Sequence, residues 1–258
     1  MIKINGRAVE DYKRFEVRED GLAVPRAEPL YVPAISNGYH PDDSIIDSSL
    51  VLYLPLYLLK GSKFKTLDRY SVLCEVTGAL WGPTGRDFDG SDDLIEISAA
   101  NSTHLDFTSG AFSGMVWVKP DVNNVIQMMM QKGAIGVDGW WFHLDSNRVF
   151  DFRTSQSGAN QITGTDETGY IKDIWQCLGF TRSGAAALVY KAGVDVTTNA
   201  GTHTDPASAS NNKFHVGIND AENARKFNGK TGEVWMWSRQ LSAADMLHAY
   251  NVTRWRYQ

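Results

Sequence analysis

Short runs of apolar residues, separated by turn residues, occupy most of this chain and set the strongest limit on its fold. Two pairs of runs form clear hairpins: residues 140–144 with 148–153, and residues 175–181 with 186–190. Runs of this length are typical of strands, and Asp, Asn, Ser and Gly between them favour tight turns. About a dozen such runs predict an all-β chain that folds as a two-sheet antiparallel sandwich.

The stretch from residue 227 to 250 predicts how the fold ends, with a core strand followed by one helix. Trp235 and Trp237 lie in an apolar run and share a face, which we expect to be the core face. Ser242 then stands in an N-cap position with Asp245 three residues later, which is the arrangement of a capping box. We therefore predict one short C-terminal helix and no comparable helix upstream.

Residues 1–47 differ in character from the rest of the chain. Asn5 and Gly6 form a strong hairpin dipeptide. Several prolines follow closely, which excludes a helix and favours an extended segment: Pro25, Pro29, Pro33 and Pro41. Two interpretations stay open, a disordered leader or an ordered arm that lies on a neighbouring subunit, and the apolar residues of this region favour the arm. We therefore divide the chain into an extended N-terminal arm or small oligomerisation segment, 1–47, and a sandwich domain, 48–258.

The net charge of the chain argues against nucleic acid as a partner, and the lack of a long apolar segment argues against membrane insertion. The formal net charge is -5, whereas phosphate binding requires a basic patch. No segment approaches the length of about 18 consecutive apolar residues that a membrane span needs. Residues 1–15 also lack the apolar segment of a signal peptide. We therefore expect either a chain that leaves the cell by another route, such as assembly into a virus particle, or a segment excised from a longer chain.

Cysteine and histidine spacing gives no sign of a zinc site. Cys74 and Cys177 are the two cysteines of the chain, and no CxxC or His-paired spacing occurs. Because both lie in apolar, strand-like contexts, we expect buried free thiols rather than a disulfide. His143, His215 and His248 are isolated in sequence and are interpreted as ordinary strand or helix residues.

Two segments resemble the laminin G-like family of concanavalin A-type jelly rolls: RDFDGSDDLIEI at 86–97 and FNGKTGEVWMWSRQLSAADMLHAY at 227–250. Further pieces follow in the family's order: LVLYLPL at 50–56, FSGMVWVKP at 112–120, WQCLGFTR at 175–182 and LVYKAGV at 188–194. The resemblance covers residues 48–258. It implies a two-sheet antiparallel jelly roll that often binds sugars or proteins and often holds a calcium ion, and it does not imply an enzyme.

Asp89, Asp92 and Asp93 crowd one tight turn and are our candidate calcium ligands. Calcium prefers several oxygen ligands from loops of this kind. The alternative is a solvated turn in which the Asp89 side chain bonds the backbone around Gly90. The family often supplies an acid in the last strand, and here Glu233 stands near that place but departs from the pattern.

No catalytic constellation is visible, so we predict that the chain is not an enzyme. Glycoside hydrolysis needs two carboxylates across the scissile bond, and the glucanase strand pattern is broken because Ser98 follows Glu96 where Asp is required. Residues 190–193 look superficially like a motif of jelly-roll alginate lyases. However, residues 152–155 lack the Glu and residues 161–163 lack the His of the partner strands.

A sugar-binding site would combine an aromatic platform with hydrogen-bonding side chains at its rim, because the C–H faces of sugars stack on rings. Adjacent Trp140 and Trp141 point to opposite faces of their strand, so one of them leaves the core side. Our candidate ligand-binding residues are Trp81, Trp140, Trp141, Asn160 and Gln161.

Together these features favour a non-enzymatic structural or adhesion protein, and in particular a virus (phage) particle component such as a decoration, fibre or tail protein. The expected location is the virion or an extracellular surface. The arm would contact other copies of the chain or other virion proteins, and the sandwich would face outward. The alternative function is a carbohydrate-binding module that recognises a surface polysaccharide.

Overall fold

The computed structural model describes residues 45–166 and 169–257, together with the backbone of four short strands nearer the N-terminus. These strands form two hairpins, β1 (Lys3–Ile4) with β2 (Arg7–Ala8) and β3 (Phe15–Val17) with β4 (Ala23–Pro25). The pairing of β1 with β2 agrees with the two short strands predicted there. Contacts divide the chain into two units, Met1–Gly38 and Tyr39–Gln258. The remainder of the predicted arm before residue 45 lies outside the described residues.

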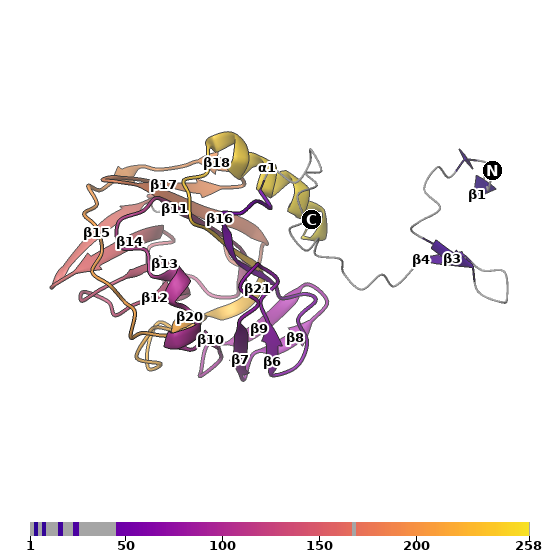
Figure 1. The fold of residues 1–258 in the computed structure, drawn as a ribbon, viewed down its shortest axis with the longest axis horizontal. Helices are drawn as coiled ribbons and strands as arrows, with labels where there is room; N and C mark the ends of the chain where they lie inside the picture. The colour runs from indigo at the N-terminus through magenta and orange to yellow at the C-terminus, as the bar shows by residue number, and fades with distance from the viewer. Residues whose placement is uncertain are drawn as a thin grey trace. The chain divides into compact units, whose positions relative to one another are not determined.

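Two antiparallel sheets face each other in the second unit, which confirms the predicted sandwich (Figure 1). The nine-stranded sheet runs in the order β19 (Asn199–Ala200), β15 (Ala159–Gly164), β14 (Phe150–Gln156), β13 (Trp140–Leu144), β12 (Gln127–Lys132), β20 (Phe214–Val216), β10 (Leu94–Ile97), β7 (Leu73–Thr77) and β6 (Lys63–Lys65). The eight-stranded sheet runs in the order β18 (Val194–Asp195), β17 (Ala186–Lys191), β16 (Gln176–Ser183), β11 (Phe112–Pro120), β21 (Asn228–Trp237), β9 (Gly85–Asp89) and β8 (Leu80–Gly82), with β5 (Leu50–Pro55) also paired to β21. Both hairpins predicted from the sequence are present, as β13–β14 and β16–β17.

The core between the sheets is built from alternating side chains of facing strands, as a half-buried sheet requires. Aromatic rings dominate its centre. Phe152 and Phe180 stack across the two sheets with ring centroids 4.1 Å apart, and Phe112 meets both rings edge-on. Cys74 and Cys177 are buried free thiols, as expected.

A second apolar layer lies on the other side of the eight-stranded sheet, beneath helix α1 (Ala243–Thr253). Trp235 and Trp237 share this face, so they are buried as predicted but under the helix rather than between the sheets. The helix begins with the predicted capping box: the Asp245 N–H donates to Ser242 Oγ, and the Ser242 N–H donates back to the Asp245 carboxylate.

The remaining helical segments are single 3-10 turns: η1 (Ala99–Asn101), η2 (Thr103–Leu105) and η3 (Arg254–Arg256). Within the described part of the chain, no helix has the length and apolar character needed to cross a membrane. Residues just before β5 already belong to the sandwich, because Trp237 Nε1 donates to the Ile45 carbonyl at 2.6 Å and Arg239 pairs with Asp47 at 2.9 Å.

Candidate functional site

The outer face of the nine-stranded sheet carries a continuous row of polar side chains. Strand pairing places Glu96 opposite His215, His215 opposite Gln131, Gln131 opposite Trp141, and Trp141 opposite Arg153. We call these five residues the polar row. They share one face because side chains directly opposite each other in an antiparallel sheet point the same way. Their sequence neighbours, such as Ile95, Val216 and Phe142, point into the core instead.

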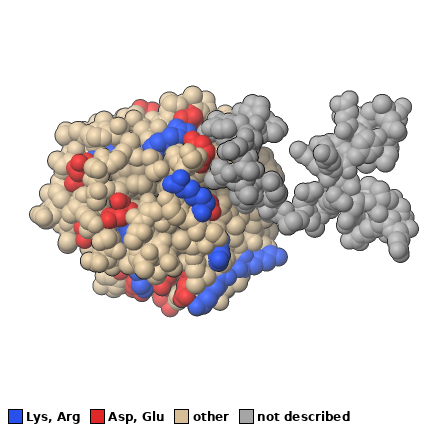
Figure 2. Space-filling view, in the orientation of Figure 1, with Lys and Arg blue, Asp and Glu red and all other residues tan. Residues whose placement is uncertain are grey.

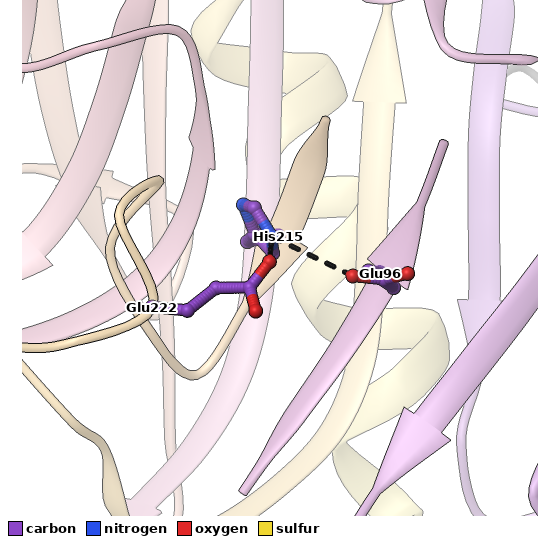
Figure 3. A group of neighbouring side chains, drawn as sticks. All are labelled: Glu96, His215 and Glu222. Atoms are coloured by element: carbon purple, nitrogen blue, oxygen red, sulfur yellow. Dashed lines mark hydrogen bonds and ion pairs between the residues drawn. The ribbon is translucent and has the colours of Figure 1, made fainter. Parts of the chain in front are cut away.

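At one end of the polar row, Glu96, His215 and Glu222 point toward one another (Figure 3). His215 Nε2 lies 3.2 Å from Glu222 Oε1 and 3.9 Å from Glu96 Oε2. The Lys213 ammonium lies between the carboxylates, 2.6 Å from Glu96 and 2.9 Å from Glu222. Lys213 therefore lowers the pKa of Glu222, while burial lowers the pKa of His215. This end is an ion-pair network with a neutral imidazole at its base.

The other end of the polar row is a second network, which surrounds Arg153. The guanidinium donates two hydrogen bonds to the Asp151 carboxylate, at 2.7 and 2.9 Å, and one to Asp145 at 3.1 Å. His143 lies beneath them, 3.4 Å from Asp151 and 3.7 Å from Asp145, and holds the pKa of Asp145 well below its usual range. Planar, bidentate Arg–carboxylate contacts of this kind are strong and fixed in orientation.

The loop 217–227 covers the middle of the polar row. The Met128 N–H donates to the Arg225 carbonyl at 2.7 Å, and the Gln131 amide donates to Asp220 at 3.0 Å. Glu222 of the same loop completes the network around His215. The loop therefore explains why side chains on an outer sheet face are withdrawn from solvent.

Several atoms on this face of the sheet are buried without a hydrogen-bond partner within residues 45–166 and 169–257. They are Trp141 Nε1, Gln131 Oε1, His215 Nδ1 and both ring nitrogens of His143. Buried polar atoms are normally paired, and each unpaired one costs about 1–3 kcal/mol. A cluster of four such side chains on one sheet face is therefore the most distinctive polar feature of the described molecule.

The five predicted ligand-binding residues do not come together. Trp141 lies in the polar row, but it is buried there, whereas Trp140 points into the core and donates to the Leu105 carbonyl at 3.0 Å. Asn160 accepts a hydrogen bond from Ser155, and Gln161 accepts one from the Thr154 hydroxyl at 3.1 Å. The adjacent tryptophans thus point to opposite faces, as expected, yet neither presents an open platform.

The fifth candidate, Trp81, lies on the edge strand of the other sheet. Its indole N–H donates to the Tyr57 carbonyl at 3.1 Å, and the Lys60 ammonium lies 4.4 Å from its ring centroid. The Arg256 guanidinium then lies over both the Tyr57 ring and the Trp255 ring. We call these five residues the aromatic–basic array. Tyr57, Lys60 and Arg256 carried no sequence signal of a site.

The three candidate calcium ligands do gather, with carboxylate oxygens within 4.8 Å of one another. Their all-oxygen chemistry suits calcium. Two of them already bond the turn, however. Asp93 accepts the Asp89 N–H at 2.7 Å, and Asp89 accepts the Ser91 N–H at 2.7 Å, which is an Asx turn. Glu233 is remote from this cluster, because it binds Trp235 and Tyr257 in the layer beneath the helix.

The sequence interpretation missed the charged networks around two histidines, His143 and His215. His143 and His215 were interpreted as ordinary strand residues, but each forms the floor of a charged network. A signal did exist around the β13–β14 hairpin. Trp141 and His143 alternate with core residues on one strand, and Asp151 and Arg153 do so on the next. Polar residues at alternate positions of paired strands indicate a shared polar face.

Comparison with known proteins agrees with this architecture. A family model described as the concanavalin A-like lectin/glucanases superfamily matches residues 89–246. The structure is similar to that of Trypanosoma rangeli sialidase in complex with sialic acid, with a TM-score of 0.58 and 17% identity over 79% of this chain and 33% of the sialidase. It is also similar to the binding domain of botulinum neurotoxin DC in complex with rat synaptotagmin II, with a TM-score of 0.61 and 14% identity over 80% of this chain and 52% of the toxin domain.

The chain therefore spans about a third of the sialidase and half of the toxin domain, and at these identities the likeness concerns the fold alone. No curated protein matches the sequence. The family match covers more than half of the chain and includes most of both segments on which the resemblance rested, residues 89–97 of the first and 227–246 of the second. From its strand order, its two-sheet core and this match, the chain belongs to the concanavalin A-like lectin/glucanases superfamily, as a laminin G-like member.

Proposed function

We propose that this chain is a non-catalytic glycan-binding protein whose ligand binds on the outer face of the nine-stranded sheet, along the polar row. The observation that supports the proposal is the cluster of buried, unpaired polar atoms on Gln131, Trp141, His143 and His215. These side chains are closed to solvent in the described structure, so binding requires the covering loop 217–227 to move. Sugar hydroxyls both donate and accept hydrogen bonds, so a ligand that enters there would satisfy the indole N–H as well as the amide oxygen. The ion-pair networks at both ends of the row supply fixed charged partners at its rim.

The same geometry argues against catalysis. A general acid needs a carboxyl group that is protonated near the working pH, which requires a raised pKa. Glu222 and Asp145 have lowered pKa values instead, because Lys213 and His143 lie beside them. Both carboxylates therefore serve better as hydrogen-bond acceptors than as proton donors.

The test is a titration of neutral and acidic oligosaccharides against the intact chain and its Trp141→Phe variant. Phe keeps an aromatic ring but lacks the indole N–H, so we expect affinity to fall about tenfold, as the loss of one buried hydrogen bond requires. The matched control is Gln161→Ala, which removes an amide on β15, two strands away from Trp141, that does not belong to the polar row. Equal affinities of Trp141→Phe and the intact chain would refute the site. Release of reducing or unsaturated ends from any oligosaccharide would refute the absence of catalysis.

The finer proposal is that the protein is a structural or adhesion component of a virus (phage) particle, with the sandwich facing outward at the virion or an extracellular surface. The division of the chain at Gly38 supports a separate N-terminal unit for contacts with other copies or other virion proteins. Light scattering of the full chain and of a chain that begins at Tyr39 tests this idea. An oligomer that becomes a monomer on truncation is expected, and two monomers would contradict it.

Calcium binding at Asp89, Asp92 and Asp93 also remains a proposal, supported by the gathering of their carboxylates. Calcium must compete with the two backbone N–H groups that already occupy Asp89 and Asp93. We expect millimolar calcium to raise the melting temperature of the intact chain but not that of Asp92→Asn. No shift with the intact chain would identify the cluster as a structural turn.

A further inference from the structure

The aromatic–basic array forms one continuous strip made from three distant parts of the chain. Tyr57 and Lys60 follow β5, Trp81 belongs to β8, and Arg256 and Trp255 belong to η3. A hydrogen bond joins Trp81 to the Tyr57 backbone, and the Arg256 guanidinium lies 5.0 Å from the Tyr57 ring and 4.8 Å from the Trp255 ring. Each cation therefore lies over at least one ring of the strip, and such cation–π contacts favour a fixed arrangement of both groups.

Much of this strip faces solvent. Trp255 is 72% exposed and Trp81 is 37% exposed, although tryptophan is among the side chains that gain most from burial. Lys60 is also exposed, and so is Arg254, which precedes Trp255 in η3 and lies over the Tyr250 ring just outside the array. Exposed tryptophan next to arginine is the composition of binding hot spots rather than of ordinary surface.

The strip carries a local excess of positive charge on a chain whose net charge is -5. Arg256 has a buried counter-charge, because its Nε lies 3.3 Å from Glu233. Lys60 and Arg254 have no carboxylate partner among the residues that the structure describes. Two cations thus remain free to bind an anionic group beside exposed aromatic rings.

We propose that the aromatic–basic array is a second binding site, distinct from the polar row, and that its ligand is an acidic saccharide bearing carboxylate or sulfate groups. The Trp255 and Trp81 rings would stack on the C–H faces of the sugars, while Lys60 and Arg254 would pair with the acidic groups.

Single-stranded nucleic acid also combines stacking with negative charge, but it presents a phosphate at every step and needs a basic groove that follows the backbone. Two free cations do not make such a groove. Lys, Arg, Asp and Glu side chains are interspersed on the face drawn in Figure 2, and uncharged residues cover most of it. A saccharide with one or two charged units fits the array better.

The test is a calorimetric titration of the full chain with uronate and sulfated oligosaccharides, each paired with its methyl-esterified or desulfated form. The two forms share the same rings and differ in charge alone, so we expect the acidic form to bind at least about tenfold more tightly. Rising salt should weaken this difference, because exposed charge pairs are screened.

Two variants locate the site. Trp255→Ala should weaken binding of both forms, because it removes the stacking ring, whereas Lys60→Gln should reduce the preference for the acidic form and leave the neutral form unchanged. Lys65→Gln, which removes an exposed cation that belongs to neither proposed site, is the matched control and should not alter binding of the acidic form.

Three results would overturn the inference: no acidic saccharide binds, the acidic and neutral forms bind equally, or an oligothymidylate binds more tightly than every acidic saccharide. Loss of binding in Trp141→Phe, with no effect of Trp255→Ala or Lys60→Gln, would support the polar row and refute the array. The two proposals therefore fail separately.

Discussion

Lys132 offers the sharpest quantitative test of the structure, because it is buried in the sandwich and contacts no carboxylate directly among the described residues. Its side chain is fully buried on β12. The ammonium donates to Ser102 Oγ at 2.9 Å and to the Asn212 carbonyl. Burial lowers its pKa from 10.5 to about 8, although the charges of Asp106 and Asp138 act in the opposite direction. The charged form of Lys132 is therefore less favourable in the folded chain than in the unfolded chain.

The sign of the effect on stability follows from proton binding. Between the folded-state pKa of about 8 and the unfolded value of 10.5, the unfolded chain holds more protons at this site. The free energy of unfolding must therefore rise as pH rises through this window. The full difference is worth roughly 3 kcal/mol, of which about 2 kcal/mol falls between about pH 7 and 9.5.

The assay is urea denaturation of the intact chain and of Lys132→Met at several pH values in this range. Other groups, including the buried thiols and tyrosines, titrate in both proteins, so the difference between the two curves isolates Lys132. We expect the intact chain to gain about 2 kcal/mol relative to Lys132→Met as pH rises. Lys65→Met, at an exposed strand position, should show no such trend. If the free energies of unfolding of the intact chain and of Lys132→Met differ by the same amount at every pH, the lowered pKa of the buried Lys132 ammonium is refuted.

Three further predictions follow from local contacts. Ser242→Ala removes the acceptor of the Asp245 N–H and should lower the free energy of unfolding by about 1 kcal/mol; no loss in urea denaturation would show that packing alone holds this helix end. Arg256→Met leaves the buried Glu233 carboxylate without its cation and should lower the free energy of unfolding by about 3–5 kcal/mol. The loss should be much smaller when Glu233 is already replaced by Gln. Equal losses with and without Glu233→Gln would contradict the ion pair. Burial raises the pKa of Cys74 to about 12 and that of Cys177 well above its usual value. A thiol reagent at about pH 8 should therefore label neither residue until the chain unfolds. Prompt labelling of the native chain would show that the thiols are accessible.

Features that depend on neighbours in sequence were predicted well. The alternation of apolar residues identified the strands, and the pairs of runs around 145–147 and 183–185 identified two hairpins. The capping box was visible from Ser242 and Asp245 alone.

The candidate sites were predicted poorly, because their residues meet only through long-range pairing. The polar row joins strands from residue 94 to residue 216, and its register decides which side chains share a face. Whether Trp141 is an exposed platform or a buried side chain depends on what covers its face of the sheet, which the tryptophan pair itself does not reveal. Asn160 and Gln161 lie on β15 of the same sheet, but their side chains accept hydrogen bonds from Ser155 and Thr154 of the adjacent strand.

The sequence by itself thus determined the fold class, the strand-forming segments, the C-terminal helix and its cap, and the family, because each depends on local periodicity or on motifs short enough to be seen along the chain. Tertiary structure alone decided that Lys213 and Arg153 neutralise the carboxylates around the polar row, and that Tyr57, Trp81 and Trp255 share a strip of surface. These contacts join segments far apart in the chain, and their energies depend on burial and exact distance. Neither quantity exists until the two sheets have packed together.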